Sequence, residues 1–132
     1  MPGSSLWLLP PSDHPLDATL TNLINSTSTR FNSPHLFVPH VTLTVDINPA
    51  TYATEPQAWL NSLILPDRGN VKVQLGELQS DDFFFKKLYF NVGKHGVGDL
   101  AKVARMKVNG FEEEETANMW VEKEYKPHLS LL

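Results

Sequence analysis

The residues of this chain that could do chemistry include two histidines that stand in the same local sequence. Each follows a proline and precedes an aliphatic residue, a hydroxyl residue and a leucine, which pairs His40 with Thr42 and His128 with Ser130. In a strand, residues two positions apart share one face and lie about 6.5–7 Å apart along the backbone. An imidazole and a hydroxyl group are then neighbours on a rigid element. The imidazole can transfer a proton, and the hydroxyl group can donate a hydrogen bond to the same side of a phosphate.

The other three histidines lack this setting. His35 also follows a proline, but a phenylalanine stands where the hydroxyl residue would be, so we expect only a loop or strand-entry role. We expect His14 to be a solvated side chain at a helix start and His95 to lie in a glycine-rich strand-to-helix turn. The five histidines occur singly, without a His-Glu-x-x-His pair, so the sequence predicts no metal site.

The composition narrows the remaining classes of protein. Of 132 residues, 41% are hydrophobic and 20% are charged, which is typical of one ordered globular domain. The absence of cysteine excludes a disulfide scaffold and a thiol nucleophile. A formal net charge of -4 repels a long polyanion, so we expect no binding to duplex DNA. No apolar run reaches the roughly 18 residues of a membrane span. The short apolar run at residues 6–9 has no basic segment before it, so the sequence does not predict a signal peptide. The absence of cysteine and of a signal peptide suits the cytoplasm, which is the expected location, and we expect a monomer.

Hydrophobic periodicity and turn residues divide the chain into short elements. Short apolar or alternating segments predict strands, and apolar residues at helical spacing predict helices. The expected strands cover residues 6–9, 40–47, 71–78, 83–92 and 125–132, and the expected helices begin at 13–15, 54–57 and 98. One strand pair is a plain hairpin and the crossovers are short. We therefore expect an α+β domain with an antiparallel-rich sheet packed on helices, rather than a doubly wound parallel sheet.

Local patterns predict further details of these elements. Strict alternation from His40 places Val41, Leu43, Val45 and Ile47 on one face of the strand and Thr42, Thr44 and Asp46 on the other. Asp13 is expected to cap the first helix, and Thr54 and Gln57 to form a capping box for the second. The apolar face of that second helix includes Trp59, Leu63 and Ile64. The acidic run at 112–115 is expected to be a solvated loop or helix end.

The two histidine sequences together resemble the two-histidine phosphoesterase superfamily, and within it the fungal cyclic phosphodiesterases. Residues 124–131, the opening at 6–11 and Phe84-Phe85-Lys86-Lys87 are similar to that family as well, although only the two histidine sequences are specific. The resemblance implies a single two-lobed, pseudo-symmetric α+β domain over residues 1–132, with helices outside and a central cleft between the histidine strands. Because members of the family continue beyond the second histidine sequence, we expect this chain to be truncated at its C-terminus.

The resemblance also implies an activity and roles for single residues. The activity is metal-independent hydrolysis of nucleoside 2′,3′-cyclic phosphates to 2′-phosphates. It extends to ADP-ribose 1″,2″-cyclic phosphate, a by-product of tRNA splicing, which yields the 1″-phosphate. One histidine would act as general acid and the other as general base, and we hypothesise that His40 is the acid and His128 the base. Thr42 and Ser130 would bind the phosphate oxygens, and no cofactor is expected. The candidates for stacking on a nucleotide base are Trp7, Tyr125 and Phe85.

Three other functions stay open on the sequence alone. The chain could be a member of the same superfamily that processes RNA ends, although its acidic charge and few arginines do not favour a long RNA ligand. It could be a non-catalytic nucleotide-binding module, or an interaction protein in which the two histidine sequences are fortuitous.

The location in the cell also has an alternative. The resemblance to fungal relatives suggests association with the Golgi instead of the cytoplasm.

Overall fold

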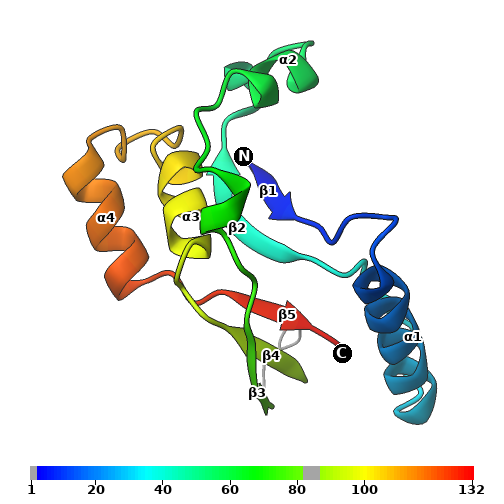
Figure 1. The fold of residues 1–132 in the computed structure, drawn as a ribbon. Coiled ribbons are helices and arrows are strands. Elements are labelled where there is room, and N and C mark those ends of the chain that lie inside the picture. The colour runs from blue at the N-terminus through cyan, green and yellow to red at the C-terminus, as the bar shows by residue number, and fades with distance from the viewer. Residues whose placement is uncertain (1–2, 82–86) are drawn as a thin grey trace.

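The computed structural model describes residues 3–81 and 87–132 and consists of short strands and helices (Figure 1). In chain order the elements are β1 (Ser4–Leu8), α1 (Pro15–Arg30), β2 (Val41–Ile47), the 3-10 turn η1 (Pro49–Thr51), α2 (Pro56–Asn61), the 3-10 turn η2 (Arg68–Asn70), β3 (Leu75–Gln79), β4 (Tyr89–Val92), α3 (Val97–Arg105), α4 (Glu114–Lys123) and β5 (His128–Ser130). Among the helices of the described residues, none has both the length and the apolar character to cross a membrane.

The strands form two separate antiparallel sheets, with the helices outside them. β1 pairs with β2 in one sheet, and the other has the order β3–β4–β5. Figure 1 shows α1 beyond one end of the β1–β2 pair and α3 and α4 side by side at the other. The α+β prediction is confirmed, including the antiparallel hairpin, although its first strand begins only at Leu75. The part of the expected second strand at residues 83–86 lies outside the described residues.

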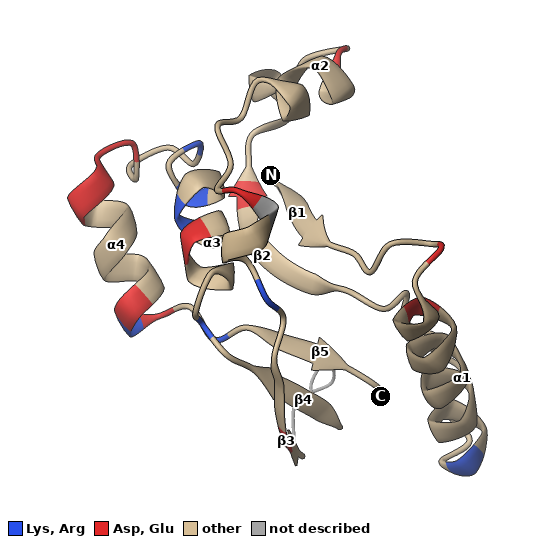
Figure 2. Cartoon of the chain, in the orientation of Figure 1, with Lys and Arg blue, Asp and Glu red and all other residues tan. Residues whose placement is uncertain are grey.

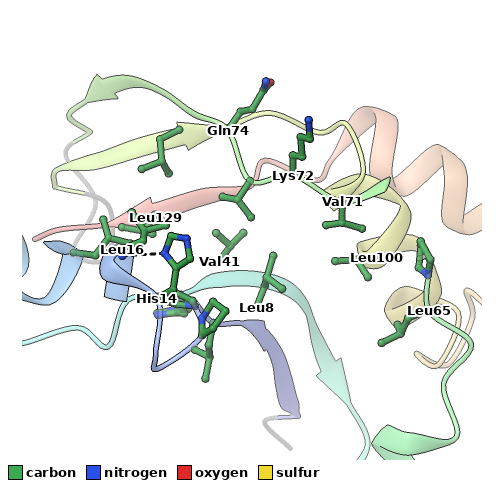
Figure 3. Close-up of a pocket in the computed structure, with 18 residues that line it drawn as sticks. Leu8, His14, Leu16, Val41, Leu65, Val71, Lys72, Gln74, Leu100 and Leu129 are labelled. Atoms are coloured by element: carbon green, nitrogen blue, oxygen red, sulfur yellow. Dashed lines mark hydrogen bonds between the residues drawn. The ribbon is translucent and has the colours of Figure 1, made fainter. Parts of the chain in front are cut away.

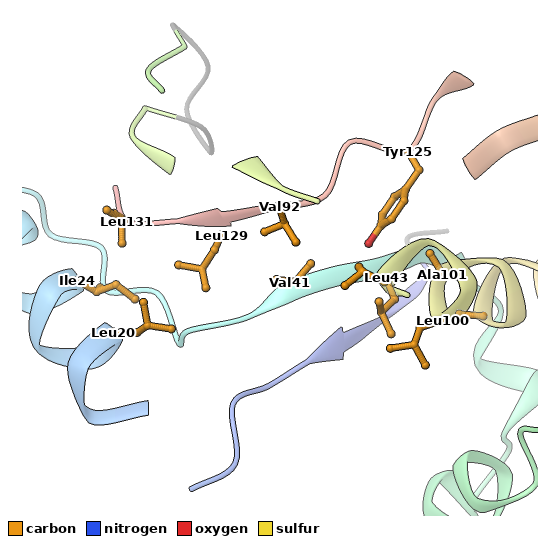
Figure 4. Close-up of a cluster of buried hydrophobic side chains, with 12 residues drawn as sticks. Leu20, Ile24, Val41, Leu43, Val92, Leu100, Ala101, Tyr125, Leu129 and Leu131 are labelled. Atoms are coloured by element: carbon orange, nitrogen blue, oxygen red, sulfur yellow. The ribbon is translucent and has the colours of Figure 1, made fainter. Parts of the chain in front are cut away.

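An apolar core lies between the two sheets (Figure 4). Val41 and Leu43 of β2 face Val92 and Leu129 of β4 and β5, and none of the four is more than 6% exposed. The helices close the two ends of this layer with Leu20 and Ile24 from α1 and Leu100, Ala101 and Ala104 from α3. The aliphatic residue after each of the two paired histidines therefore belongs to one core. That core holds β2 against β5 although the two strands are in different sheets.

The strict alternation expected for β2 is wrong in its second half. Thr44 is 1% exposed and Val45 is 44% exposed, so these two residues have exchanged their expected faces. The cause is a register shift, because positions two residues apart on β1 pair with Ile47 and Thr44, which are three apart on β2. Asp46, within this bulge, has a φ of 65°. A bulge adds one residue to a strand and turns the following side chains over, which periodicity alone does not reveal.

The inward-facing Thr44 meets a buried cation. Arg105 of α3 is 7% exposed, and its Nη1 donates to Thr44 Oγ1 at 3.3 Å. Its guanidinium carbon lies 4.0 Å from the ring centroid of Phe111 and 4.4 Å from that of Trp120. Burial lowers the pKa of Arg105, and the carboxylate of Asp46 opposes this change. Arginine stays protonated inside proteins, so the charged group joins α3 and α4 to the bulge of β2.

Proline determines where two helices begin, and it corrects both expected caps. α1 and α2 each have proline at the first helical position, so the residue before it is the N-cap. For α1 this is His14 and not Asp13, and His14 Nδ1 accepts the backbone N–H of Leu16 at 3.0 Å. For α2 it is Glu55, whose side chain makes no capping bond, and the capping box expected at 54–57 is wrong.

The extents of α2 and α4 also differ from expectation. α2 ends at Asn61, so the expected apolar face does not extend to Ile64, which is 89% exposed, although Leu63 is buried. The acidic run at 112–115 is a helix end as expected, because α4 begins at Glu114. The body of α4 was not predicted, since Ala117 is its one buried residue and the apolar pattern is correspondingly weak.

The glycine-rich segment after β4 is a strand-to-helix turn, as expected for His95. Gly96 is the N-cap of α3 and has a φ of 75°. A Cβ at this position would lie 2.5 Å from the carbonyl oxygen of Asn70. Only glycine combines this conformation with so close an approach, so the turn fixes α3 against the segment that precedes β3.

The surroundings of two buried tyrosines, Tyr125 and Tyr89, disfavour ionisation of their hydroxyl groups. Tyr125 is 6% exposed, and burial raises its pKa above the ordinary value. Tyr89 is 4% exposed and donates its hydroxyl proton to the carboxylate of Asp81 at 2.9 Å. This hydrogen bond to an anion, together with burial, raises the pKa of Tyr89.

Truncation of the shared core should weaken the whole fold. Leu129→Ala removes a side chain that is 3% exposed, so we expect the free energy of unfolding to fall by about 2–5 kcal/mol. Urea unfolding at pH 7 measures this loss. The matched control is Ile64→Ala at a position that is 89% exposed, where the change should stay within about 0.5 kcal/mol. Equal losses in both variants would contradict the assigned core.

The two tyrosines make the fold sensitive to alkali. Free tyrosine titrates near pH 10, so above this pH the unfolded chain loses protons that native Tyr125 and Tyr89 retain. Stability is therefore constant with respect to these groups below about pH 10 and falls as the pH rises further, and Tyr125 alone contributes at most ~1.4 kcal/mol per pH unit to this fall. Urea midpoints between pH 8 and 11 should show this fall, and Tyr125→Phe should reduce its slope. An equally steep fall in that variant would contradict the assignment to Tyr125.

Candidate active site

The first histidine of the pair, His40, directly precedes β2 and is held by its own backbone. Its Nδ1 lies 2.6 Å from the carbonyl oxygen of Val38. A carbonyl oxygen only accepts hydrogen bonds, so Nδ1 carries the proton and donates it. Nε2 is then the nitrogen at which this imidazole gains or loses its second proton.

Trp7 forms one side of this first half-site. Its ring stacks on His40, with a centroid separation of 3.8 Å and an interplanar angle of 17°. Trp7 is also the cross-strand partner of Thr42, so all three residues lie at the same place on the β1–β2 sheet. Trp7 is 45% exposed, which leaves part of the indole open to solvent.

The second half-site, on β5, repeats the local geometry of the first. Nδ1 of His128 lies 3.0 Å from the carbonyl oxygen of Lys126, again two residues before the histidine. Its aromatic neighbour is Tyr89, in an edge-on contact at 5.6 Å and 72°. Tyr89 is the cross-strand partner of Ser130. Each half-site thus combines a histidine with Nδ1 bound to a carbonyl, a hydroxyl residue two positions on, and an aromatic ring from the adjacent strand.

A cavity of about 730 Å³ opens beside the first half-site, between the two sheets (Figure 3). His40 lines it together with Val41 and Leu129, and much of the remaining wall is apolar. Its polar lining includes His14, whose Nδ1 is used in capping α1, and Lys72. His128 is not one of the described residues that line the cavity. The second histidine sequence borders the cavity through its aliphatic residue, and the structure does not bring both imidazoles into this one space.

The three candidates for base stacking have different surroundings. Trp7 is partly exposed beside His40, as described above. Tyr125 is 6% exposed and stacks on Trp120 at 5.2 Å and 25°, so its ring is part of the core. Its hydroxyl donates to the carbonyl oxygen of Thr42 at 2.8 Å. Phe85 lies outside the described residues.

The strands of the two half-sites carry little charge. β1 and β5 contain no charged residue, and Asp46 is the one charged residue of β2 (Figure 2). Within residues 3–81 and 87–132, no three His, Cys, Asp or Glu side chains gather as they would around a metal ion. The two described half-sites therefore contain two imidazoles, the half-buried Thr42, the buried Ser130 and aromatic rings.

Sequence reasoning missed two residues near the site. Tyr89 was assigned only to a strand, and its place beside His128 depends on the β4–β5 register, which no local pattern encodes. His14 was expected to be solvated; it is exposed, but it also caps α1 and lines the cavity. The Pro15 that follows His14 was a usable signal for the cap.

Comparison with known proteins identifies the family of this chain. The family model for cyclic phosphodiesterase-like protein matches residues 1–132. A 2′,3′-cyclic-nucleotide 3′-phosphodiesterase of Phaeosphaeria nodorum is 49% identical over 133 residues, which cover 100% of this chain and 69% of that protein. The protein of the same name from Neurospora crassa is 36% identical over 150 residues, covering 100% of this chain and 71% of the relative. This chain therefore belongs to the cyclic phosphodiesterase-like proteins, a family of hydrolases that act on phosphodiester bonds.

Proposed function

We propose that this protein hydrolyses cyclic phosphodiesters on small nucleotides, converting nucleoside 2′,3′-cyclic phosphates to 2′-phosphates. The observation that carries the proposal is the repeated half-site on two strands that pack against each other. Relatives that match the whole chain are named 2′,3′-cyclic-nucleotide 3′-phosphodiesterases, which supports the same chemistry.

Two imidazoles can supply both proton transfers of this reaction. Nε2 of neutral His128 takes a proton from the attacking water, and a bond forms between that water oxygen and phosphorus. The bond from phosphorus to the ribose 3′ oxygen breaks, and Nε2 of protonated His40 gives its proton to this leaving oxygen. The product keeps its phosphate on the 2′ oxygen, and each proton transfer contributes roughly 10²–10⁴-fold to the rate. This route needs both Nε2 atoms to reach one phosphate bound between β2 and β5, and it needs no metal ion.

The hydroxyl groups of the half-sites complete the phosphate site. Thr42 and Ser130 would donate to the non-bridging oxygens, where negative charge increases in the transition state. The exposed part of the Trp7 indole would take the nucleotide base, and the cavity beside His40 is of a size that suits a small ligand. Tyr125 is left out of this platform because its ring is buried.

The charge near the site supports a small substrate. Backbone binding of RNA needs several lysine or arginine residues, whereas Lys72 is the single one among the described residues that line the cavity, and neither β1 nor β5 carries one. We therefore favour a small nucleotide over an RNA end, with ADP-ribose 1″,2″-cyclic phosphate as a second substrate. We further propose a monomer in the cytoplasm, with association with the Golgi as the alternative.

Both histidines should be essential, and a third should not. We expect His40→Ala and His128→Ala each to lower kcat for adenosine 2′,3′-cyclic phosphate by about 10²–10⁴-fold, because each removes one proton transfer. The assay measures release of the 2′-phosphate in excess chelator. His35→Ala is the matched control, since His35 also follows a proline but has Phe37 in place of the hydroxyl residue two positions on, and it should retain full turnover.

The outcome of this assay separates the competing functions. Nucleotide binding without turnover by the folded parent would identify a binding module and sink the proposed hydrolysis. Turnover that requires added metal would overturn the mechanism with two imidazoles. Full activity in both alanine variants would show that the repeated half-site is fortuitous.

The reaction should have a bell-shaped dependence on pH. One imidazole must be neutral and the other protonated, so kcat/KM should fall both in acid, where the base is protonated, and in alkali, where the acid is deprotonated. Initial rates between pH 4.5 and 9.5 would measure the two limbs. A rate that stays constant across this range would rule out acid–base catalysis by two histidines.

A further inference from the structure

Tyr125 connects the two histidine sequences directly. It lies three residues before His128, and its hydroxyl donates at 2.8 Å to the carbonyl oxygen of Thr42, two residues after His40. These partners are 83 positions apart in the chain. The bond therefore joins the strand of one half-site to the segment that enters the strand of the other.

The Tyr125 ring has little freedom to move. It stacks on Trp120 of α4, and its backbone N–H donates to the carbonyl oxygen of Trp120 at 2.9 Å. The same indole lies over the guanidinium of Arg105, which holds Thr44 farther along β2. The carbonyl of Thr42 and the hydroxyl of Thr44 are thus both held by groups from α3, α4 and the segment after α4.

The direct packing of β2 against β5 is not directional in the way that a hydrogen bond is. These strands are in different sheets, so no hydrogen-bond ladder between them fixes their register. Their contact includes Val41 and Leu129 in the shared apolar core. Apolar packing is not directional, whereas a hydrogen bond has a preferred length and angle. The hydroxyl of Tyr125 therefore restricts how β2 can slide along the segment that leads to His128.

We propose that Tyr125 is a positioning residue, whose hydrogen bond to the Thr42 carbonyl fixes one half-site relative to the other. The inference rests on the proposed function, in which both half-sites act on one phosphate. Catalytic groups that are misplaced by about 1 Å can lower a rate 10²-fold. Loss of this bond should therefore affect the chemical step more than the binding of substrate.

Tyr125→Phe in the full chain tests the proposal, because it removes the hydroxyl and keeps the ring against Trp120. We expect kcat for adenosine 2′,3′-cyclic phosphate to fall about 10–100-fold while KM changes by less than about 3-fold. The matched control is Tyr52→Phe, which removes a tyrosine hydroxyl that is hydrogen-bonded to Ser4 at the far end of β1. This control should keep the kcat of the parent.

The readouts separate positioning from a purely structural role. Near-ultraviolet circular dichroism gives the folded fraction, and kcat is expressed per folded molecule. A kcat equal to that of the parent in folded Tyr125→Phe would overturn the proposal while leaving the proposed function intact, whereas a parent without turnover would overturn the proposed function itself. If the variant unfolds, the comparison is repeated in trimethylamine N-oxide, an excluded osmolyte that favours the compact state. A variant that stays unfolded there would make Tyr125 a determinant of the whole fold and would also overturn the proposal.

Discussion

The packing of β2 against β5 is the constraint on which the rest of this structure depends. Val41 and Leu129 lie in one core, and each directly follows a histidine of the repeated sequence. Because side chains alternate along a strand, burying these two residues determines which faces carry the imidazoles and hydroxyls. The same packing leaves two sheets without a common hydrogen-bond ladder. The relative placement of the half-sites must then come from directional contacts elsewhere.

Arg105 is one source of such direction, and it shows how a charged group can organise a small core. Burying a cation costs several kcal/mol unless other groups compensate for the lost water. Here two aromatic faces, the hydroxyl of Thr44 and the carboxylate of Asp46 provide that compensation. These partners come from β2, α4 and the loop before α4, so the stabilisation of one charge brings three parts of the chain together. The bulge of β2 is what turns Thr44 towards this cation.

What the sequence could reveal was limited to patterns of short range. Strand period, proline and glycine placement and the repeated histidine sequence indicated the α+β class, the hairpin and the turn at His95, and the resemblance suggested the family. The faces of Thr44 and Val45 could not be predicted, because a bulge depends on the register with β1. The contact of Tyr89 with His128 likewise depends on pairing between distant strands. The cap formed by His14 was readable from the following proline, but the commoner capping residue Asp13 was preferred.

A repeated half-site suits a reaction that needs two opposite proton transfers. Opening a cyclic phosphodiester requires a base at the attacking water and an acid at the leaving oxygen, and in the proposed mechanism one strand unit used twice supplies an imidazole for each. Identical surroundings would give the two imidazoles no reason to differ in role. The aromatic neighbours of the two imidazoles differ, because His40 packs on the face of the Trp7 indole and His128 contacts Tyr89 edge-on. In the proposed mechanism, these unequal neighbours are what distinguishes the two halves of a repeated scaffold.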